Sequence, residues 1–290
     1  MEPVNKIAIY GSRRQAGYLP ELPRLFNFLS NSGFRIYIES KFGKYLEENQ
    51  VDTYGAIPSE HLPASVSMVM SLGGDGTFLR ASSWIGKREI PILGVNTGHL
   101  GFLASCGLSD AEEMMKQVCR GEIRIERRMV LEVVSDDLPP ERWPYALNEI
   151  AFMRYGSPML SVRASVNDLF LADYRGDGLI VSTPTGSTAY SLSAGGPIME
   201  PTLDCMGLCP VAPHTLTLRP LVAGADSKIA LQPESRANNF ILTIDDQSMV
   251  MPAKGNFFIR RAPFSILVIR KKEEGFPSIL RQKLLWSATP

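Results

Sequence analysis

The first hundred residues alternate short apolar runs with stretches in which apolar residues recur at helical spacing. Residues 7–10 predict a first strand, 19–29 a helix whose apolar side chains fall on one face, and 34–38 a second strand. The same rhythm continues with a helix at 41–50, a strand at 66–71, a helix at 78–85 and a strand at 91–95. Strands that alternate with helices in this way are typical of an open, doubly wound parallel sheet, so we expect an α/β N-terminal domain.

The pattern changes after about residue 105. A helix fits 110–119, and most later segments alternate apolar and polar residues, as in 160–166, where Asn167 and Asp168 supply a turn into a strand at 169–174. Further strands fit 228–231, 240–244, 256–260 and 265–269, which are separated by Pro, Gly and Asn. We therefore expect an antiparallel, two-sheet β-sandwich as the second domain. The tail at 278–286 is again helical in pattern, but the pattern does not show which domain it packs on.

The composition is that of an ordinary globular protein, with 290 residues, 44% hydrophobic and 21% charged. Basic and acidic residues number 30 each, so the formal charge is zero, and we expect no general attraction to nucleic acid or to an anionic membrane. The sequence contains no run of roughly 18 apolar residues, and its start lacks a cationic region followed by a long apolar core. These features predict a cytoplasmic protein.

Four cysteines are scattered along the chain without a disulfide pattern: Cys106, Cys119, Cys205 and Cys209. We expect all of them to be reduced. Cys205, Cys209 and His214 approximate the spacing of zinc ligands only loosely. Burial as small side chains is the simpler interpretation.

The segment Gly73–Thr77, with the sequence GGDGT, joins the strand predicted at 66–71 to the helix predicted at 78–85. Ligands of doubly wound sheets bind beyond the carboxyl ends of the strands, where glycines let the backbone approach a phosphate and the helix offers unpaired N–H groups. Asp75 can accept a hydroxyl proton or hold a magnesium ion there, as phosphoryl transfer requires. Alternatively, the segment is a glycine-rich turn in which Asp75 caps the helix. Arg80 can reach a phosphate or remain a solvated surface residue.

The segment Asp177–Pro197 is dominated by small and hydroxylated residues. Such a run can bring backbone amides and hydroxyl groups close to a flat ligand, while Tyr190 offers an aromatic ring and Asp177 an acceptor for an exocyclic amine. A nucleobase fits that description. The alternative is a serine- and threonine-rich loop between strands, although long loops inside a compact domain are usually functional.

Asn148 and Glu149 combine an amide with a carboxylate directly before the apolar run 150–153. Taken alone, the pair is most simply interpreted as a polar strand end that is solvated.

Taken together and in this order, these segments resemble NAD kinases. The resemblance rests on Gly73–Thr77, on Asn96–Leu103 with the sequence NTGHLGFL, on Leu147–Glu149 and above all on Asp177–Pro197. It covers nearly the whole chain. The Gly-Gly-Asp-Gly core is shared with diacylglycerol kinases, sphingosine kinases and phosphofructokinases, whereas among these families only NAD kinases also carry the Asp177 segment.

The resemblance implies a Rossmann-like kinase domain at 1–105, a β-sandwich NAD-binding domain at 106–270, and a C-terminal segment at 271–290 that returns to the first domain. It also implies a homodimer or homotetramer in which a neighbouring subunit completes the NAD site. The implied substrates are NAD and ATP, with another nucleoside triphosphate or polyphosphate as alternative donors, and Mg²⁺ is the expected metal.

Carried over by position, Asp75 matches the acid that takes the proton from the adenosine 2′-hydroxyl, and Gly76 lies beside that ribose. Asn148 and Glu149 match the pair that contacts adenine and the nicotinamide-side ribose. Asp245 and Gln247 match a late loop at the nicotinamide end. The adenine-binding run and its flank comprise Arg175, Asp177, Thr188, Ala189, Tyr190, Ser191 and Ser193, and the phosphate-binding candidates are Gly73, Gly74 and Arg80.

The sequence thus predicts a kinase that phosphorylates NAD to NADP with Asp75 as general base. Two other functions stay open at this point. A lipid kinase of the diacylglycerol type shares the glycine motif, although the chain lacks a basic amphipathic segment for membrane contact. A regulator that binds nucleotide without catalysis would keep the adenine-binding run and tolerate the loss of Asp75.

Overall fold

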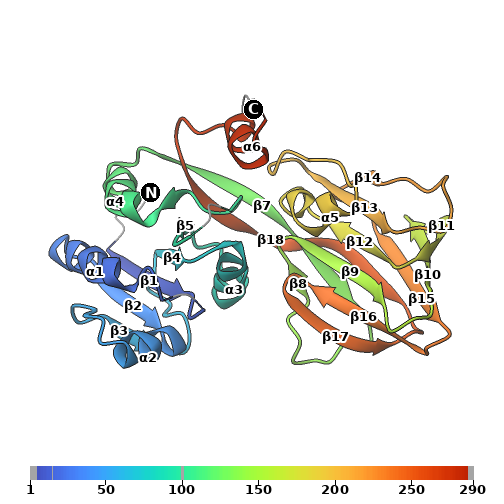
Figure 1. Cartoon of the computed structure of the whole chain (residues 1–290), viewed down its shortest axis with the longest axis horizontal. Helices are drawn as coiled ribbons and strands as arrows, with labels where there is room; N and C mark the ends of the chain where they lie inside the picture. Colours follow the sequence, from blue (N-terminus) through green and yellow to red (C-terminus); the bar gives the residue numbers. More distant parts are fainter. Residues whose placement is uncertain (1–4, 15, 99–100, 287–290) are drawn as a thin grey trace. The chain divides into compact units, whose positions relative to one another are not determined.

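The computed structural model describes residues 5–14, 16–98 and 101–286. The chain divides into two compact units, of which unit 1 contains Met1–Arg127 and Ile266–Pro290, and unit 2 contains Arg128–Ser265. Two long strands continue from one unit into the other, β7 (Ile123–Val134) and β18 (Phe257–Lys271) (Figure 1).

Unit 1 is built on a parallel sheet with helices around it (Figure 1). The strand order is β3 (Ile57–Ser59), β2 (Arg35–Glu39), β1 (Lys6–Gly11), β4 (Met68–Leu72) and β5 (Ile92–Asn96), and β5 then pairs in parallel with the end of β18 and with the short β6 (Cys106–Gly107). The helices are α1 (Leu22–Asn31), α2 (Ser40–Glu48), α3 (Asp75–Ile85), α4 (Ala111–Arg120) and α6 (Phe276–Leu284), with short 3₁₀ turns at Leu19–Glu21 and Leu108–Asp110. The expected doubly wound α/β domain is confirmed.

Helix α4 places the observed unit boundary later than the sequence suggested. Its Met114, Met115 and Val118 are buried in one core with the apolar face of α1 and with strands β1 and β4. The expected boundaries lay at 105 and 270, whereas the units divide at 127 and 265. The pattern after residue 105 does change to period two, but the amphipathic α4 has its partner in the first sheet, so it belongs to unit 1.

Unit 2 contains two antiparallel sheets. One has the order β14 (Leu221–Gly224), β13 (Cys205–Val211), β12 (Gly178–Ser182), β9 (Glu149–Arg154), β16 (Asn239–Ile244) and β17 (Gln247–Pro252). The other contains β11 (Leu169–Gly176), β10 (Leu160–Val166), β15 (Ile229–Ser235) and the start of β18, with β7 and the short β8 (Tyr145–Ala146) alongside. A 3₁₀ turn at Gly186–Thr188 and helix α5 (Tyr190–Ser193) follow β12.

The core of unit 2 lies between these sheets. Phe152 and Phe240 stack in the first sheet with ring centroids 5.3 Å apart, and Phe257 of β18 meets both rings edge-on at 5.4 Å. All three side chains are fully buried. The β-sandwich expectation is therefore confirmed.

Two local expectations had different outcomes. Asn167 and Asp168 both have positive φ, 51° and 65°, as the tight hairpin turn between β10 and β11 requires. The two strands expected at 256–260 and 265–269 form one strand, β18, which includes Pro263, because the φ that the proline ring fixes is compatible with extended backbone. Across the described residues, no helix is long and apolar enough to span a bilayer.

Candidate functional site

The turn between β4 and α3 leaves the start of the helix open. Gly73 has φ +152°, and a Cβ there would lie 2.4 Å from the Thr77 hydroxyl oxygen, so only glycine fits. Gly74 is the N-cap and supplies no side-chain hydrogen bond to the helix. The first N–H groups of α3 are therefore available to an anion, and the positive end of the helix dipole points the same way.

The Asp75 carboxylate is held by the segment that follows β5, and not by the N–H groups of its own helix. Its Oδ2 accepts a hydrogen bond from the Phe102 N–H at 2.9 Å, and its Oδ1 accepts one from the Leu103 N–H at 3.1 Å. The close approach depends on Gly101, where a Cβ would lie 2.0 Å from Asp75 Oδ1. The helix-cap alternative is wrong, because these donors belong to the segment after β5. The half-buried carboxylate keeps lone pairs for a substrate proton.

Arg270, which was not among the predicted site residues, fixes the segment that holds Asp75. Its guanidinium donates to the Phe102 carbonyl at 2.6 Å and to the Ala104 carbonyl at 2.7 Å. The side chain is only 1% exposed, and burial lowers its pKa while Glu126 opposes that shift. The sequence does show an arginine directly after the apolar run 265–269, which could have marked it as a buried charge. It could not show which carbonyls this arginine binds.

The strand order of unit 1 indicates where a ligand would bind. The chain proceeds from β1 to β2 and β3 on one side, and β4 then pairs on the opposite side of β1. The order in which the chain adds strands therefore reverses between β1 and β4, and open α/β sheets bind ligands at such a point, beyond the carboxyl ends of the strands. The Ser12 N–H donates to the Leu72 carbonyl at 2.8 Å, which brings the segment after β1 beside the glycine turn.

Two arginines lie at this end of the sheet. Burial and then the negative charge of Glu39 raise the pKa of the Tyr10 phenol, and the charges of Arg80 and Arg13 oppose that shift. The Arg80 guanidinium also donates to the Thr77 hydroxyl at 3.4 Å. Positive charge and open helix N–H groups thus accompany Asp75, as a site for phosphate groups requires.

In unit 2, Asn148 lies in a bend directly before β9, and Glu149 is the first residue of that strand. Glu149 is 7% exposed, its Oε2 has no hydrogen-bond partner, and burial followed by the charge of Asp245 raises its pKa to about 8. Asp245 accepts hydrogen bonds from the N–H groups of Leu147, Asn148 and Glu149. Its carboxylate therefore faces the turn, whereas the resemblance implied contact with the nicotinamide end.

The Asp177 segment forms a strand and tight turns instead of a long loop. Asp177 pairs with Arg154 at 2.6 Å between its Oδ1 and the guanidinium Nε. Tyr190 begins helix α5 and is 40% exposed, so its ring is available to a ligand. Thr188 donates to the Thr185 carbonyl at 3.3 Å. Ser191 is buried, Ser193 is exposed, and Ala189 precedes α5.

The remaining predicted positions lie on the β-sandwich. Arg175 is exposed near the end of β11, and its carbonyl accepts a hydrogen bond from the His214 N–H at 2.8 Å. Gln247 begins β17, directly after the turn that contains Asp245. The structure thus brings Gly73, Gly74, Asp75, Gly76 and Arg80 together in unit 1, and it gathers Asn148, Glu149 and Asp245 in unit 2.

Comparison with known proteins identifies the family. A model of the ATP-NAD kinase N-terminal domain matches residues 8–123, and a model of the ATP-NAD kinase C-terminal domain matches residues 147–271. The chain belongs to the ATP-NAD kinase family. It is 41% identical over 288 residues to the NAD kinase of Porphyromonas gingivalis, with 98% of this chain and 99% of that relative covered. The NAD kinase of Bacteroides fragilis is also 41% identical, over 287 residues, with 98% of each chain covered.

Solved structures agree with this membership of the ATP-NAD kinase family. A yeast NADH kinase complexed with NADH superposes with a TM-score of 0.86 over 100% of this chain and 90% of that chain, and its 22% identity establishes the fold alone. An NAD kinase from Archaeoglobus fulgidus in complex with ATP superposes with a TM-score of 0.73 at 27% identity, covering 96% of this chain and 97% of that one.

The two domain models of the ATP-NAD kinase family divide the candidate residues between them. The N-terminal match contains the Asp75 turn and the C-terminal match contains the positions from Asn148 to Gln247. Of the motif Asn96–Leu103, His99 and Leu100 lie outside the described residues.

The four cysteines form no disulfide bond in the part of the chain that the structure describes. All four are free, with Cys106 and Cys209 buried. Cys209 lies close to the Ala194 carbonyl at 3.4 Å, and Cys205 lies 3.5 Å from the sulfur of Met199. Over the part of the chain that the structure describes, no group of three or more His, Cys, Asp or Glu side chains is arranged to hold a metal ion.

Proposed function

We propose that this chain transfers the γ-phosphoryl group of ATP to the 2′-hydroxyl of the adenosine ribose of NAD, giving NADP and ADP. The observation that carries the proposal is the placement of Asp75. Its carboxylate is fixed by the Phe102 and Leu103 N–H groups at the open start of α3, next to the place where the strand order reverses between β1 and β4. Family membership supports the same substrates.

In the proposed reaction, Asp75 accepts the proton of the 2′-hydroxyl as the oxygen attacks the γ-phosphorus in line. The bond between that phosphorus and the bridging oxygen to the β-phosphate breaks, and ADP leaves with the electron pair. The two backbone N–H groups hold the carboxylate so that its free lone pairs stay directed at the substrate. Arg80 and the N–H groups of α3 stabilise the charge on the transferring phosphoryl group.

We propose ATP as the donor, with another triphosphate or polyphosphate as the alternatives to test. The described residues fit a metal bound mainly through the donor's phosphates and water, because no protein cluster of three ligands is present among them. When bound, Mg²⁺ would neutralise phosphate charge, and Asp75 is the carboxylate of the glycine turn that could contact it directly or through water.

For the acceptor, we propose that Asn148 and Glu149 contact adenine and the nicotinamide-side ribose. Asp177, Arg175, Gln247 and the residues from Thr188 to Ser193 complete the dinucleotide site. The exposed ring of Tyr190 and the buried, unpartnered Oε2 of Glu149 support this assignment, since each offers a ligand an aromatic face or a hydrogen-bond acceptor.

We also propose a homodimer or homotetramer in which a neighbouring subunit completes the NAD site. Strand β11 lies at the edge of its sheet, and Leu169 and Phe170 on it are 75% and 62% exposed. Exposed apolar residues on a sheet edge are typical of a surface that a second copy covers. Light scattering after size-exclusion chromatography tests the mass, and a monomer that still makes NADP contradicts the shared site.

The four free cysteines support a cytosolic location.

The test of the function is an assay of purified protein with ATP, Mg²⁺ and NAD, in which NADP is detected by an NADP-specific dehydrogenase. We expect NADP from the wild type with NAD, and no phosphorylated lipid when diacylglycerol replaces NAD. Phosphorylated lipid would favour a lipid kinase, and binding without product would favour a regulator. Asp136→Asn is the matched control for variants of Asp75, because Asp136 is exposed in a turn of unit 2.

A further inference from the structure

The backbone turn of Leu147, Asn148 and Glu149, here called the 147–149 turn, carries the two side chains proposed to bind the dinucleotide. We propose that Asp245 is a positioning residue for NAD, whose carboxylate fixes the backbone of the 147–149 turn so that the Asn148 and Glu149 side chains are held for the ligand. This inference rests on the proposed function, and it replaces the direct ligand contact that the resemblance implied for Asp245.

The Asp245 carboxylate binds every backbone N–H of the 147–149 turn. Its Oδ2 accepts from Leu147 at 2.8 Å, and its Oδ1 accepts from Asn148 at 2.8 Å and from Glu149 at 3.2 Å. The Asp245 N–H in turn donates to the Glu149 carbonyl at 3.0 Å. A carboxylate that receives this many N–H bonds acts as an anchor, because a side chain that offers fewer acceptors leaves a buried N–H unpaired.

The two other carbonyls of the turn are bound from the opposite direction by Thr183. Its hydroxyl donates to the Leu147 carbonyl at 2.6 Å, and its N–H donates to the Asn148 carbonyl at 2.8 Å. Gly186 allows this close approach, since a Cβ there would lie 2.0 Å from the Asn148 carbonyl oxygen. All six backbone polar groups of the 147–149 turn are therefore satisfied within unit 2.

The side chains of the turn are left for a ligand. Asn148 and Glu149 are 9% and 7% exposed, and the Oε2 of Glu149 has no hydrogen-bond partner among the residues that the structure describes. Buried polar groups normally have partners. A rigid backbone that carries an unpartnered carboxyl is the arrangement expected of a preorganised binding site.

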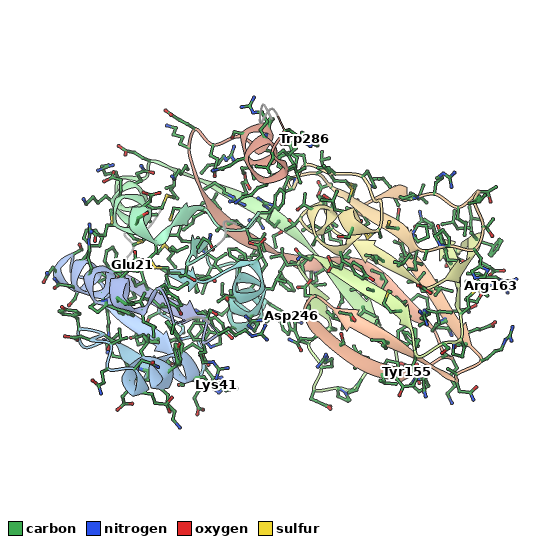
Figure 2. The ribbon with its side chains drawn as sticks, in the orientation of Figure 1. Glu21, Lys41, Tyr155, Arg163, Asp246 and Trp286 are labelled. Carbon is green, nitrogen blue, oxygen red and sulfur yellow. The ribbon has the colours of Figure 1, made fainter. Side chains whose placement is uncertain are left out.

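Asp245 also acts on Glu149 through its charge. Desolvation is the main cause of the raised pKa of Glu149, and Asp245 is the charged group that adds to it. The pKa of Asp245 is itself raised to about 6 by burial, against the effect of its three N–H bonds, and Asp246 raises it further. Asp246, which is labelled in Figure 2, is exposed in the turn between β16 and β17. Removing the Asp245 charge should therefore shift the ionisation of Glu149 to lower pH.

The experiment compares Asp245→Asn with the wild type in the NADP-forming assay. Asparagine has nearly the same shape, but its NH₂ group would face N–H donors, so one or two bonds to the turn are lost. We expect KM for NAD to rise about tenfold or more, since an unpaired buried donor costs roughly 1–3 kcal/mol, whereas KM for ATP changes less than about twofold. The pH midpoint of the change in KM for NAD should also move to lower pH, because the pKa of Glu149 falls when the charge of Asp245 is removed. A purely structural loss would leave this midpoint unchanged.

Thr183→Val provides a second variant that keeps the shape of the side chain. It removes the hydroxyl that donates to the Leu147 carbonyl and accepts from the Gly186 N–H at 3.0 Å. Thr183→Val should also raise KM for NAD. If Asp245→Asn does not fold, an unchanged KM for NAD in Thr183→Val contradicts the claim that the fixed backbone of the 147–149 turn positions the side chains for NAD. Thr243→Val is the control, because Thr243 lies on β16 two residues before Asp245 and its hydroxyl bonds to Ser248 of the same hairpin.

Wild-type NADP formation tests the proposed function separately from these variants. If the wild type makes NADP and Asp245→Asn keeps both the KM for NAD and its pH midpoint, the positioning role is wrong and the proposed function stands. Equal increases in KM for NAD and ATP would also overturn it, because they would indicate a general loss of structure.

Discussion

Gly101→Ala tests whether the segment after β5 positions the carboxylate of Asp75, the proposed general base. A Cβ at this position would lie 2.0 Å from Asp75 Oδ1 and 2.3 Å from its Cγ. Non-bonded carbon and oxygen atoms need a little over 3 Å, so the carboxylate and the segment must separate by about 1 Å. That movement stretches the hydrogen bonds from Phe102 and Leu103, which are 2.9 and 3.1 Å long.

A displacement of about 1 Å at a reacting group can cost about 100-fold in rate. We therefore expect kcat of Gly101→Ala to fall by about 100-fold, with KM for NAD changed only slightly, because Asn148 and Glu149 lie in the other unit. Steady-state kinetics at saturating ATP and NAD measure both constants.

Gly107→Ala is the matched control for this change. It lies in the same segment, its φ is −77°, and its nearest neighbour to a new Cβ is the Ser109 hydroxyl oxygen at 3.7 Å, which is an ordinary contact. Gly107→Ala should keep its kcat within about twofold, since nothing has to move. A Gly101→Ala enzyme as fast as the wild type would refute the claim that this segment positions Asp75.

Three further changes test other parts of the account. Arg270→Met leaves the partly buried carbonyls of Phe102 and Ala104 without donors, so the free energy of unfolding measured in urea should fall by about 3 kcal/mol; an unchanged midpoint would contradict the role given to Arg270. Glu149 has a folded pKa of about 8 against an ordinary 4.5, so its contribution to stability is complete below 4.5 and is lost as pH rises through 8. Between these values the free energy of unfolding should fall by up to about 1.4 kcal/mol per pH unit, and Glu149→Gln should flatten that slope; equal slopes would show that Glu149 is not the group responsible. Tyr190→Ala should raise KM for NAD about tenfold if its exposed ring stacks on the base, and a KM equal to that of the wild type would remove Tyr190 from the site.

The fold could be predicted from the sequence as far as local pattern determines it. The alternation of strands and helices before residue 105 identified the parallel sheet, and the Asn167-Asp168 turn identified a hairpin. The helix at Ala111–Arg120 was recognised from its own periodicity, but its partner was not, because an amphipathic pattern shows that a face is buried and not against which sheet. The same limit hid the continuity of β18, whose Pro263 looked like a break.

The candidate site was predicted in its residue types and not in its internal contacts. Asp75 was selected because it lies in a glycine-rich turn between a strand and a helix, where doubly wound sheets bind ligands. Its link to Phe102 and Leu103 joins positions 27 and 28 residues away, and no local pattern contains that information. Asp245 shows the same limit: resemblance selected the residue, but only the three hydrogen bonds to the 147–149 turn indicate how it acts.

The central claim is that Asp75 accepts the proton of the NAD 2′-hydroxyl during phosphoryl transfer. The most direct measurement follows γ-³²P from ATP into NAD in a single turnover, for the wild type and for Asp75→Asn, with calorimetry of NAD binding to both proteins. The account predicts labelled NADP at a rate that falls on the order of 10² to 10⁴-fold in the variant, with NAD affinity largely retained. Transfer at the wild-type rate by Asp75→Asn would contradict it.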